Sequence, residues 1–273
     1  MSAAAETRVS PGLRTAIRAA GLSGLALIAI AVSLTDVIAR APADAVGRGP
    51  PLTPPSAAFP FGTDILGRDV LSETAHALTV TLANSGAALA VALAAGGFAG
   101  FLAARLPFRS GFVLRWAMGI FAAIPALLLA VLIVGIGGRD LWAVAAGLAA
   151  APAGFVRAFD RARRLSAAPH AEYARASGIP ASTLLKRDLV HEFRDTFLSI
   201  AARGLAAVAI TLSTVSFFGF GAVPPHRDLG LMIAAARPTY LAAWWTAGFP
   251  ALVLVLLILC ARLAAALEEG ERP

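Results

Sequence analysis

Charged residues divide the chain into long apolar stretches and shorter polar segments. Six long stretches contain no Asp, Glu, Lys or Arg: 19–35, 77–104, 116–138, 141–156, 204–226 and 238–261. A helix needs about 20 mostly apolar residues to cross the hydrocarbon core of a bilayer. The pattern therefore predicts six transmembrane helices, of which the fifth begins before Arg203, near Thr196.

The composition supports this interpretation. Hydrophobic residues make up 58% of the 273 residues, charged residues only 14%, and the mean hydropathy is +0.76. An ordinary soluble domain carries about 25% charged residues. We therefore predict an all-α, polytopic membrane protein. The first stretch resembles a signal peptide, but no clean cleavage site follows it, so it is expected to remain as the first span.

The basic residues predict an orientation for these spans. With a cytoplasmic N-terminus, the inner segments hold 16 Lys and Arg and the outer segments hold six, while Arg203 lies inside a span. Basic residues in short loops are retained on the cytoplasmic side. Both termini are therefore expected in the cytoplasm, with 50–55 outside and 161–164 inside. The net charge of +7 is explained by this topology rather than by nucleic-acid binding.

Motifs for catalysis or cofactor binding are missing from the sequence. The only lysine, Lys186, is not preceded by the glycines of a phosphate-binding loop, and the four histidines lack metal-ligand spacing. Cys260 is the only cysteine and cannot form an internal disulfide. We expect no catalytic residue, no cofactor and no metal site, which favours a transport or scaffold subunit over an enzyme.

The inner segment 157–195 carries a motif of its own. Its residues 172–178 read Glu-Tyr-Ala-Arg-Ala-Ser-Gly. Gly178 is suited to end a helix, and Pro180 turns the chain before a second amphipathic helix near 183–190. This pattern predicts a helix-turn-helix outside the bilayer, short enough to enter a groove of another protein. It resembles the Glu-Ala-Ala-x-x-x-Gly signature of bacterial ABC importer permeases, with Tyr173 in place of the second alanine.

Three further blocks extend the resemblance over roughly 15–270. They are 61–72 (Phe-Gly-Thr-Asp-Ile-Leu-Gly-Arg-Asp-Val-Leu-Ser), 217–225 (Phe-Phe-Gly-Phe-Gly-Ala-Val-Pro-Pro), and Ala243-Trp244-Trp245 with Phe249-Pro250. Together with 172–178 they resemble the permeases of dipeptide, oligopeptide and nickel importers, nearest the oligopeptide "C" type. Glu73 stands where that family often has Arg, and 188–191 departs from its downstream Ile-x-Leu-Pro motif.

This resemblance implies the type I ABC importer fold and a division of the chain. The expected parts are a cytoplasmic tail (1–18), a first span (19–35), an extracytoplasmic loop (36–76), a five-helix core (77–262) with coupling helices at 169–190, and a cytoplasmic tail (263–273). It also implies a bacterial inner-membrane location, a second paralogous permease, two ATPase subunits that hydrolyse the ATP, and an extracytoplasmic solute-binding protein. The implied cargo is a peptide, with nickel or a metal chelate as the alternative. A scaffold that does not transport is the remaining possibility.

The resemblance assigns roles to particular residues. The expected ATPase-coupling residues are Glu172, Tyr173, Ala174, Arg175 and Gly178. Two further groups keep alternative roles. Asp64, Arg68 and Asp69 either contact the binding protein or hold the outer loop together through turns and ion pairs. Gly219 and Gly221 either bend the fifth span, at the pathway or a gate, or permit close packing. Trp244 and Trp245 are expected in an interfacial aromatic belt, with a substrate-facing role as the alternative.

Overall fold

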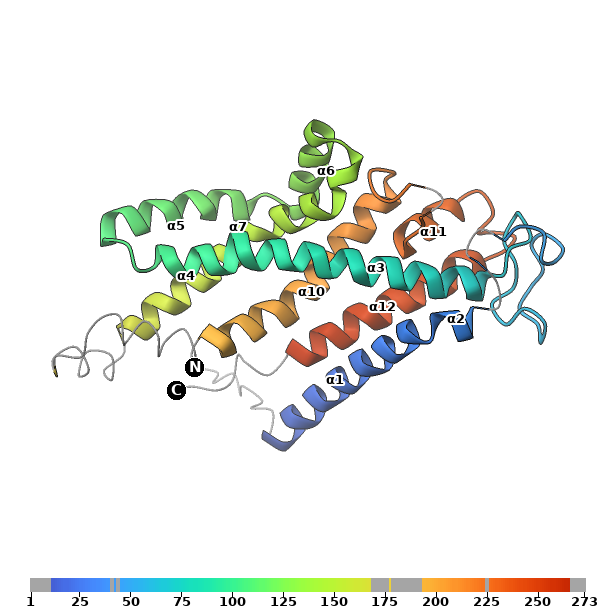
Figure 1. Ribbon diagram of the computed structural model, residues 1–273, viewed down its shortest axis with the longest axis horizontal. Coiled ribbons are helices and arrows are strands. Elements are labelled where there is room, and N and C mark those ends of the chain that lie inside the picture. Colours follow the sequence, from blue (N-terminus) through green and yellow to red (C-terminus); the bar gives the residue numbers. More distant parts are fainter. Residues whose placement is uncertain are drawn as a thin grey trace, which may run out of the picture.

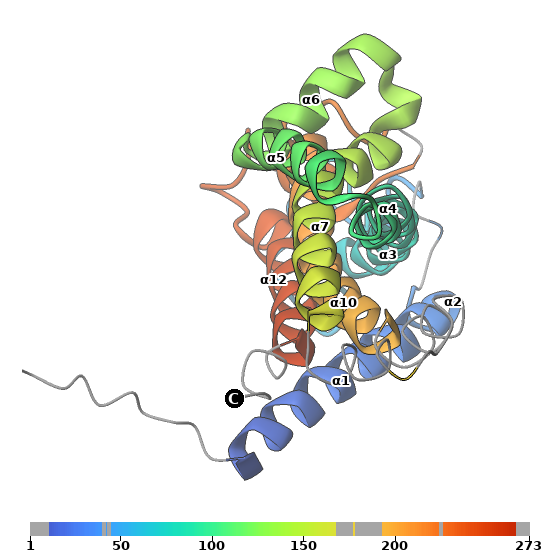
Figure 2. The same ribbon diagram turned by 90° about the vertical axis from the view of Figure 1, so that its left-hand side faces the viewer.

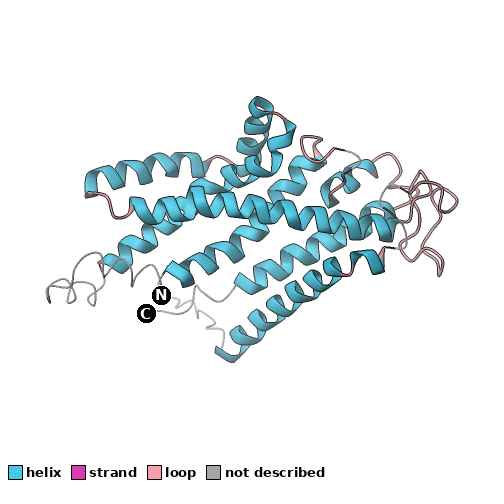
Figure 3. Cartoon of the chain, in the orientation of Figure 1, coloured by secondary structure: helices cyan, strands magenta, loops and turns pink. Residues whose placement is uncertain are grey.

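The computed structural model describes residues 11–39, 42, 45–167, 177, 193–223 and 226–265. Within these residues every helix or strand element is a helix (Figure 3), and the only bridge joins Thr63 to Asp69. The prediction of an all-α fold is therefore confirmed.

The helices follow one another along the chain as labelled in Figure 1. They are α1 (Pro11–Ser33), α2 (Thr35–Ile38), α3 (Val70–Ala92), the π-helical η1 (Leu93–Phe98), α4 (Ala99–Ala103), α5 (Phe108–Ala123), α6 (Ala126–Gly137), the 3-10 turn η2 (Arg139–Leu141), α7 (Trp142–Ser166), α10 (Phe193–Phe217), α11 (Leu229–Ala235) and α12 (Trp245–Ala265). The segment α3–η1–α4 runs as one long helix with a π-helical turn inside it.

Four helical segments are long and apolar enough to cross a membrane. They are Thr15–Ser33, Val70–Ala103, Arg139–Arg164 and Trp245–Ala265. In α10 the apolar part, Arg203–Phe217, is shorter, and α5 with α6 forms a pair bent by 91°. If α10 crosses and the bent pair counts as one span, the arrangement is compatible with the six predicted spans.

The predicted third span, 116–138, is not one helix. It breaks at Ile124–Pro125, where Ile124 adopts extended backbone (φ −77°, ψ 131°) and α6 begins after Pro125. Proline has no N–H to continue the helical bonding, and it disfavours helical backbone at the residue before it. A proline inside the apolar stretch thus bends the span that was expected to be straight. We name this bend between α5 and α6 the elbow.

Other boundaries also differ from the uncharged stretches. The fifth helix begins at Phe193, slightly before the expected start, and ends at Phe217 rather than at 226. The sixth begins at Trp245 rather than at 238. α7 runs on to Ser166, well past the apolar stretch 141–156. Absence of charge marks where a chain can be buried in lipid, whereas helix ends are set by caps and turns.

At the centre of the bundle lies α7 (Figure 2), which contacts α3, η1, α4, α5, α6 and α10. Small residues allow this contact. A Cβ on Gly96, Gly100 or Gly147 would overlap the backbone of Ala151, Phe155 or Ala88 on the facing helix. Close backbone approach through small residues is the usual way in which transmembrane helices associate.

α1 is peripheral and packs mainly along α12 (Figure 2). Gly21 lies against the backbone of Ala264, and Gly24 lies against Cys260. In Figure 1, α1 begins and α12 ends at the same end of the bundle, which we name the terminal end. Residues 45–69, α11 and the first turns of α3 and α12 gather at the opposite end, which we name the loop end.

Candidate functional site: the loop end and a central cavity

The loop 45–69 is held in place by hydrogen bonds centred on Thr63. The Thr63 hydroxyl donates to the Pro50 carbonyl (2.6 Å) and accepts from the Thr53 N–H (2.8 Å). The indole N–H of Trp245, in the first turn of α12, donates to the Thr63 carbonyl at 3.1 Å. The loop is thereby fixed to the bundle, although it contains no helix of its own. Trp245 is buried, whereas Trp244 is 60% exposed, so only Trp244 is placed to reach a lipid interface.

Two of the predicted residues at this end shape the backbone. Asp64 Oδ1 accepts from the N–H groups of Leu66 and Arg68, at 2.8 Å each, which closes a tight turn. Asp69 caps α3, since its carboxylate accepts from the Leu71 N–H at 3.3 Å and from the Ser72 hydroxyl at 2.6 Å. Aspartate is favoured at both kinds of position because its short side chain bonds to nearby backbone.

An ion-pair network connects this loop to the rest of the loop end. Glu73, in the first turn of α3, is only 5% exposed. Its Oε1 accepts from Arg68 at 3.0 Å and from Arg227 at 3.3 Å. Arg68 also lies 3.9 Å from Asp64. A carboxylate buried this deeply is stable only with such partners, so Glu73 joins the loop, α3 and the segment before α11.

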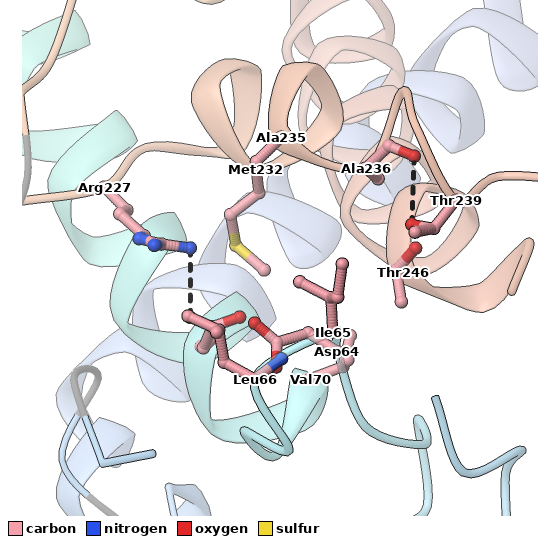
Figure 4. A pocket seen from close by; sticks show the side chains of 11 residues that line it. Asp64, Ile65, Leu66, Val70, Arg227, Met232, Ala235, Ala236, Thr239 and Thr246 are labelled. Carbon is pink, nitrogen blue, oxygen red and sulfur yellow. Dashed lines mark hydrogen bonds and ion pairs between the residues drawn. The ribbon is translucent and has the colours of Figure 1, made fainter. Parts of the chain in front are cut away.

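Glu73 and Arg227 stand between two cavities. One, of about 90 Å³, is lined by loop residues, by α3 and by α11, and Figure 4 shows Met232 and Arg227 facing Asp64, Ile65 and Leu66 across it. The other, of about 190 Å³, lies between α3 and the segment before α11. Both cavities include Glu73 and Arg227 in their walls. The ion pair therefore borders both cavities.

The predicted residues Gly219 and Gly221 lie where α10 ends. Gly219 has φ +84°, a backbone conformation that glycine adopts without strain. A Cβ on Gly221 would overlap Ser216. Two arginines donate hydrogen bonds to backbone carbonyls at this helix end. Arg139 donates to the Gly219 carbonyl (2.5 Å), and Arg237 donates to the Phe217 carbonyl (2.9 Å). Cations at a helix C-terminus also interact favourably with its dipole.

A second buried carboxylate, Asp228, fixes the path between α10 and α11. It is fully buried, caps α11 by accepting from the Leu231 N–H (2.7 Å), and accepts from the Ser216 hydroxyl (2.6 Å). Burial raises the pKa of Asp228 above its ordinary value, while these two hydrogen bonds oppose the rise. Thr81 of α3 accepts from the next N–H, that of Leu229, at 3.0 Å.

A larger cavity, of about 320 Å³, lies in the middle of the bundle at the α5–α6 elbow. Small and apolar side chains from five segments form most of its wall: Leu89, Ala92, Leu93, Ala122, Ala123, Ile124, Pro125, Ala126, Ala149, Ala150, Ala153, Gly154, Gly204 and Ala207. Arg157 and Thr211 add the polar groups. The proline that breaks the third span thus also shapes this cavity.

Comparison with known proteins identifies the family. The family described as the binding-protein-dependent transport system inner membrane component matches residues 96–269, more than half of the chain, and this range includes most of the central cavity's wall. The chain belongs to this family. It is a transport subunit of the inner membrane, with several spans, and the predicted family is confirmed.

Relatives of this inner membrane component match most of the chain. The di/tripeptide transport system permease DppC of Pseudomonas aeruginosa is 32% identical over 78% of this chain and 73% of its own length. The glutathione transport permease GsiD of Pectobacterium atrosepticum is 29% identical, covering 80% and 72%. The oligopeptide permease OppC of Mycobacterium bovis is 25% identical, covering 78% and 74%.

The predicted ATPase-coupling residues of this inner membrane component, Glu172, Tyr173, Ala174, Arg175 and Gly178, lie outside the residues that the structure describes. What the structure does give is the position of the flanking helices. α7 ends and α10 begins at the terminal end of the bundle (Figure 1), opposite the loop 45–69.

Sequence reasoning missed Arg227 and Asp228, and it noted Glu73 only as a departure from the family pattern. For Asp228 a signal was present, since an aspartate directly before a short apolar run is a typical helix cap. For the Glu73–Arg227 pair there was none, because 154 positions separate the two residues. Of the predicted loop residues, Asp64 and Arg68 join Glu73 in one network, whereas Asp69 remains at its cap.

Proposed function

We propose that the chain forms half of the translocation pathway of an ATP-driven importer for peptides. The observation that carries this proposal is the match, over more than two thirds of both chains, to permeases named for dipeptides, tripeptides, oligopeptides and glutathione. These names favour a peptide over nickel or a metal chelate as the cargo. The pathway is completed by a second, paralogous permease, and an extracytoplasmic binding protein delivers the cargo.

The central cavity supports a role in the pathway. Its volume of about 320 Å³ has room for roughly ten water molecules at about 30 Å³ each. Its wall of small apolar side chains offers few hydrogen bonds, so it would bind a passing solute weakly and with little selectivity. Weak contact is what a route needs if the solute is to leave it again, and selectivity then belongs to the binding protein.

The segment that contains residues 172–178 couples ATP hydrolysis to transport. In this proposal Glu172, Ala174 and Gly178 contact a groove in an ATPase subunit, and the two ATPases hydrolyse the ATP. The position of the flanking helices α7 and α10 supports it, because both meet the segment at the end opposite the loop 45–69. Coupling of this kind is reciprocal, so the state of the pathway must in turn affect the ATPases.

Reconstitution tests the proposal. The chain alone in liposomes should neither hydrolyse ATP nor accumulate a labelled tripeptide. Adding the second permease, the ATPases and the binding protein should restore both activities. Uphill uptake by the single chain would contradict the proposal, as would a complete complex that takes up no peptide.

A variant of the coupling segment gives a second test. Gly178→Val should leave membrane insertion intact and separate ATP hydrolysis from peptide uptake, because a β-branched residue is strained where a glycine ends a helix. Uptake per ATP hydrolysed is the measurement. A Gly178→Val complex with the unchanged ratio would remove this segment from the coupling mechanism.

A further inference from the structure

The elbow lies at the level of the middle of the bundle, not at one of its ends. The central cavity beside it is also lined by Leu89, Ala153 and Ala207, which lie well inside the long helical segments α3–η1–α4, α7 and α10. Together, α5 and α6 are apolar enough to form one membrane span. The break between them therefore falls within the hydrocarbon core of the bilayer.

At this break the backbone leaves hydrogen-bond acceptors without backbone donors. Ile124 and Pro125 both have extended backbone, with ψ 131° and 127°. Among the described residues, no backbone N–H donates to the Ile124 carbonyl. Pro125 has no N–H, and the extended backbone carries the next N–H groups away from the end of α5. The carbonyls of Ala122 and Ala123 are therefore left open as well. We name the carbonyls of 122–124 the elbow carbonyls.

Open carbonyls at this depth require a hydrated space. An unpaired backbone group is costly in hydrocarbon, and non-helical backbone at membrane depth is found where protein buries it or where it lines a water-filled cavity. Residues 122–124 are exposed, and all three line the central cavity. Its volume of about 320 Å³ falls at the lower end of the range for ligand pockets, about 300–1,000 Å³. The cavity is therefore wet at the elbow and large enough for part of a ligand.

The hydroxyl of the wall is an acceptor too. Thr211 of α10 donates its hydrogen to the Ala207 carbonyl at 3.0 Å, so only its lone pairs remain for a ligand. The residues that line the cavity include no Asp or Glu, and Arg157 is their one charged side chain. The elbow and Thr211 thus present neutral oxygen acceptors from two different helical segments. A matching ligand carries several N–H donors.

A metal ion matches these acceptors less well than a neutral donor. Hard cations take about six oxygen ligands around them, usually with carboxylates among them. Here three of the oxygens come from one short segment, no carboxylate lines the wall, and the charged side chain present is a cation. Main-chain amides carry neutral N–H donors at regular intervals, whatever the side chains are. The many alanines of the wall leave room for such a chain to approach.

We propose that the elbow carbonyls and the Thr211 hydroxyl accept hydrogen bonds from main-chain N–H groups of the transported peptide. The proposal rests on the proposed function for its cargo and adds how the pathway contacts it. Every peptide has these N–H groups, so the contact is independent of peptide sequence. Water takes the same positions when no peptide is present.

The Ile124 carbonyl can be observed directly by NMR. The chain contains two Ile–Pro bonds, 124–125 and 179–180. Labelling isoleucine with ¹³C at the carbonyl and proline with ¹⁵N therefore gives two carbon–nitrogen correlations, and Pro180→Ala removes one of them, which assigns both. The purified full chain in lipid nanodiscs is titrated with trialanine. The Ile124 signal should shift and saturate, whereas the Ile179 signal should stay in place.

A matched pair of peptides tests whether N–H groups make the contact. Trialanine methylated at both peptide nitrogens loses these donors and should bind about fivefold more weakly for each hydrogen bond lost. A tripeptide with aminoisobutyric acid at its second and third positions gains the same two methyl groups but keeps every N–H. It should bind like trialanine.

Several results would overturn the proposal. They are an Ile124 signal that trialanine does not shift, equal affinity for the N-methylated peptide, equal weakening with aminoisobutyric acid, and the same shift produced by K⁺ without peptide. The proposed function is tested separately. A complete complex that imports peptides without these shifts rejects the elbow site alone, whereas N–H-dependent binding without any uptake rejects the importer and keeps an amide-binding site.

Variants of Thr211 test the second half of the site. Thr211→Val keeps the shape of the side chain, loses the oxygen and should weaken trialanine binding about fivefold. Thr211→Ser keeps the oxygen and should retain the affinity. Thr214→Val is the matched control, because Thr214 lies on the same helix, donates in the same way to the Ile210 carbonyl (2.7 Å) and is not part of this wall. Unchanged affinity in Thr211→Val, or equal losses in the two valine variants, would contradict the assignment.

Discussion

A single carboxylate, Glu73, connects the loop 45–69 and the start of α3 to the segment before α11, which is 154 positions away in the sequence. Removing one partner of a buried ion pair is costly because the remaining charges lose their compensation. Glu73→Gln should therefore lower the free energy of unfolding by roughly 1–3 kcal/mol, less than for a fully buried pair, because Arg68 and Arg227 are 12% and 21% exposed. Thermal unfolding in detergent measures this loss. Asp140→Asn, at an exposed position of η2, is the control and should have no effect.

The raised pKa of Asp228 predicts a pH dependence. Because the folded pKa lies above the unfolded one, burial penalises the ionised form of this carboxyl group more than the protonated form. Stability should fall as the pH rises from about 4, where an unfolded aspartate ionises, until the pH passes the folded pKa. Asp228→Asn removes the titration and keeps an oxygen for the Leu231 N–H. Relative to the native chain, it should gain stability between pH 4 and pH 7, as followed by thermal unfolding; a constant difference would contradict the shift.

At the residue scale, local patterns were predictable and distant pairs were not. Asp64 and Asp69 stand in a Gly- and Asp-rich stretch, and the turn and the helix cap that they make depend on residues within a few positions. Glu73 and Arg227 meet only because α3 and the segment before α11 fold together. Whether Asp64, Arg68 or Asp69 also contacts a binding protein stays a prediction.

At the scale of helices, the stability of the bundle depends on how closely α7 packs against its neighbours. A Cβ on Gly100 would overlap the backbone of Phe155, which cannot move aside as a side chain can. Gly100→Ala should therefore destabilise the protein by about 1–3 kcal/mol through overpacking. Gly86→Ala, on the same long helix, meets nothing within 4 Å and should be neutral or stabilise by up to about 1 kcal/mol. Equal unfolding temperatures for the two variants would show that α4 and α7 do not pack in this way.

The same scale shows where apolar stretches fail as a guide to helices. The stretch 116–138 is uniformly uncharged, yet Pro125 breaks it and creates one wall of the central cavity. The stretch 204–226 is also uncharged, but α10 ends at Phe217, two residues before Gly219 takes a positive φ. Both breaking residues were visible in the sequence. The effect of Pro125 is local, whereas the end of α10 also has tertiary partners, Arg139 and Arg237, which periodicity does not reveal.

For the whole molecule, the two ends of the bundle hold different chemistry. The loop end carries the ion-pair network, both smaller cavities and the fixed loop 45–69. The terminal end receives the start of α1, the ends of α7 and α12 and the start of α10 (Figure 1). Three of the 16 basic residues counted as inner, Arg161, Arg163 and Arg164, lie in the last turns of α7, which ends here. The charge pattern of the sequence and the arrangement of the helices thus divide the chain in the same way.

This division predicts the topology that cysteine labelling would detect. In a Cys260→Ser background, which removes the only native thiol, Ala57→Cys places a thiol at an exposed position of the loop 45–69, and Arg164→Cys places one at an exposed position near the end of α7. Basic segments are retained in the cytoplasm, so a membrane-impermeant maleimide should label position 57 in intact cells. It should label position 164 only after the membrane is permeabilised. Both positions must react in detergent, which controls for buried thiols, and the background without cysteine must not react. Labelling of 164 but not 57 in intact cells would invert the orientation, and it would move the coupling segment to the side where no ATP is available.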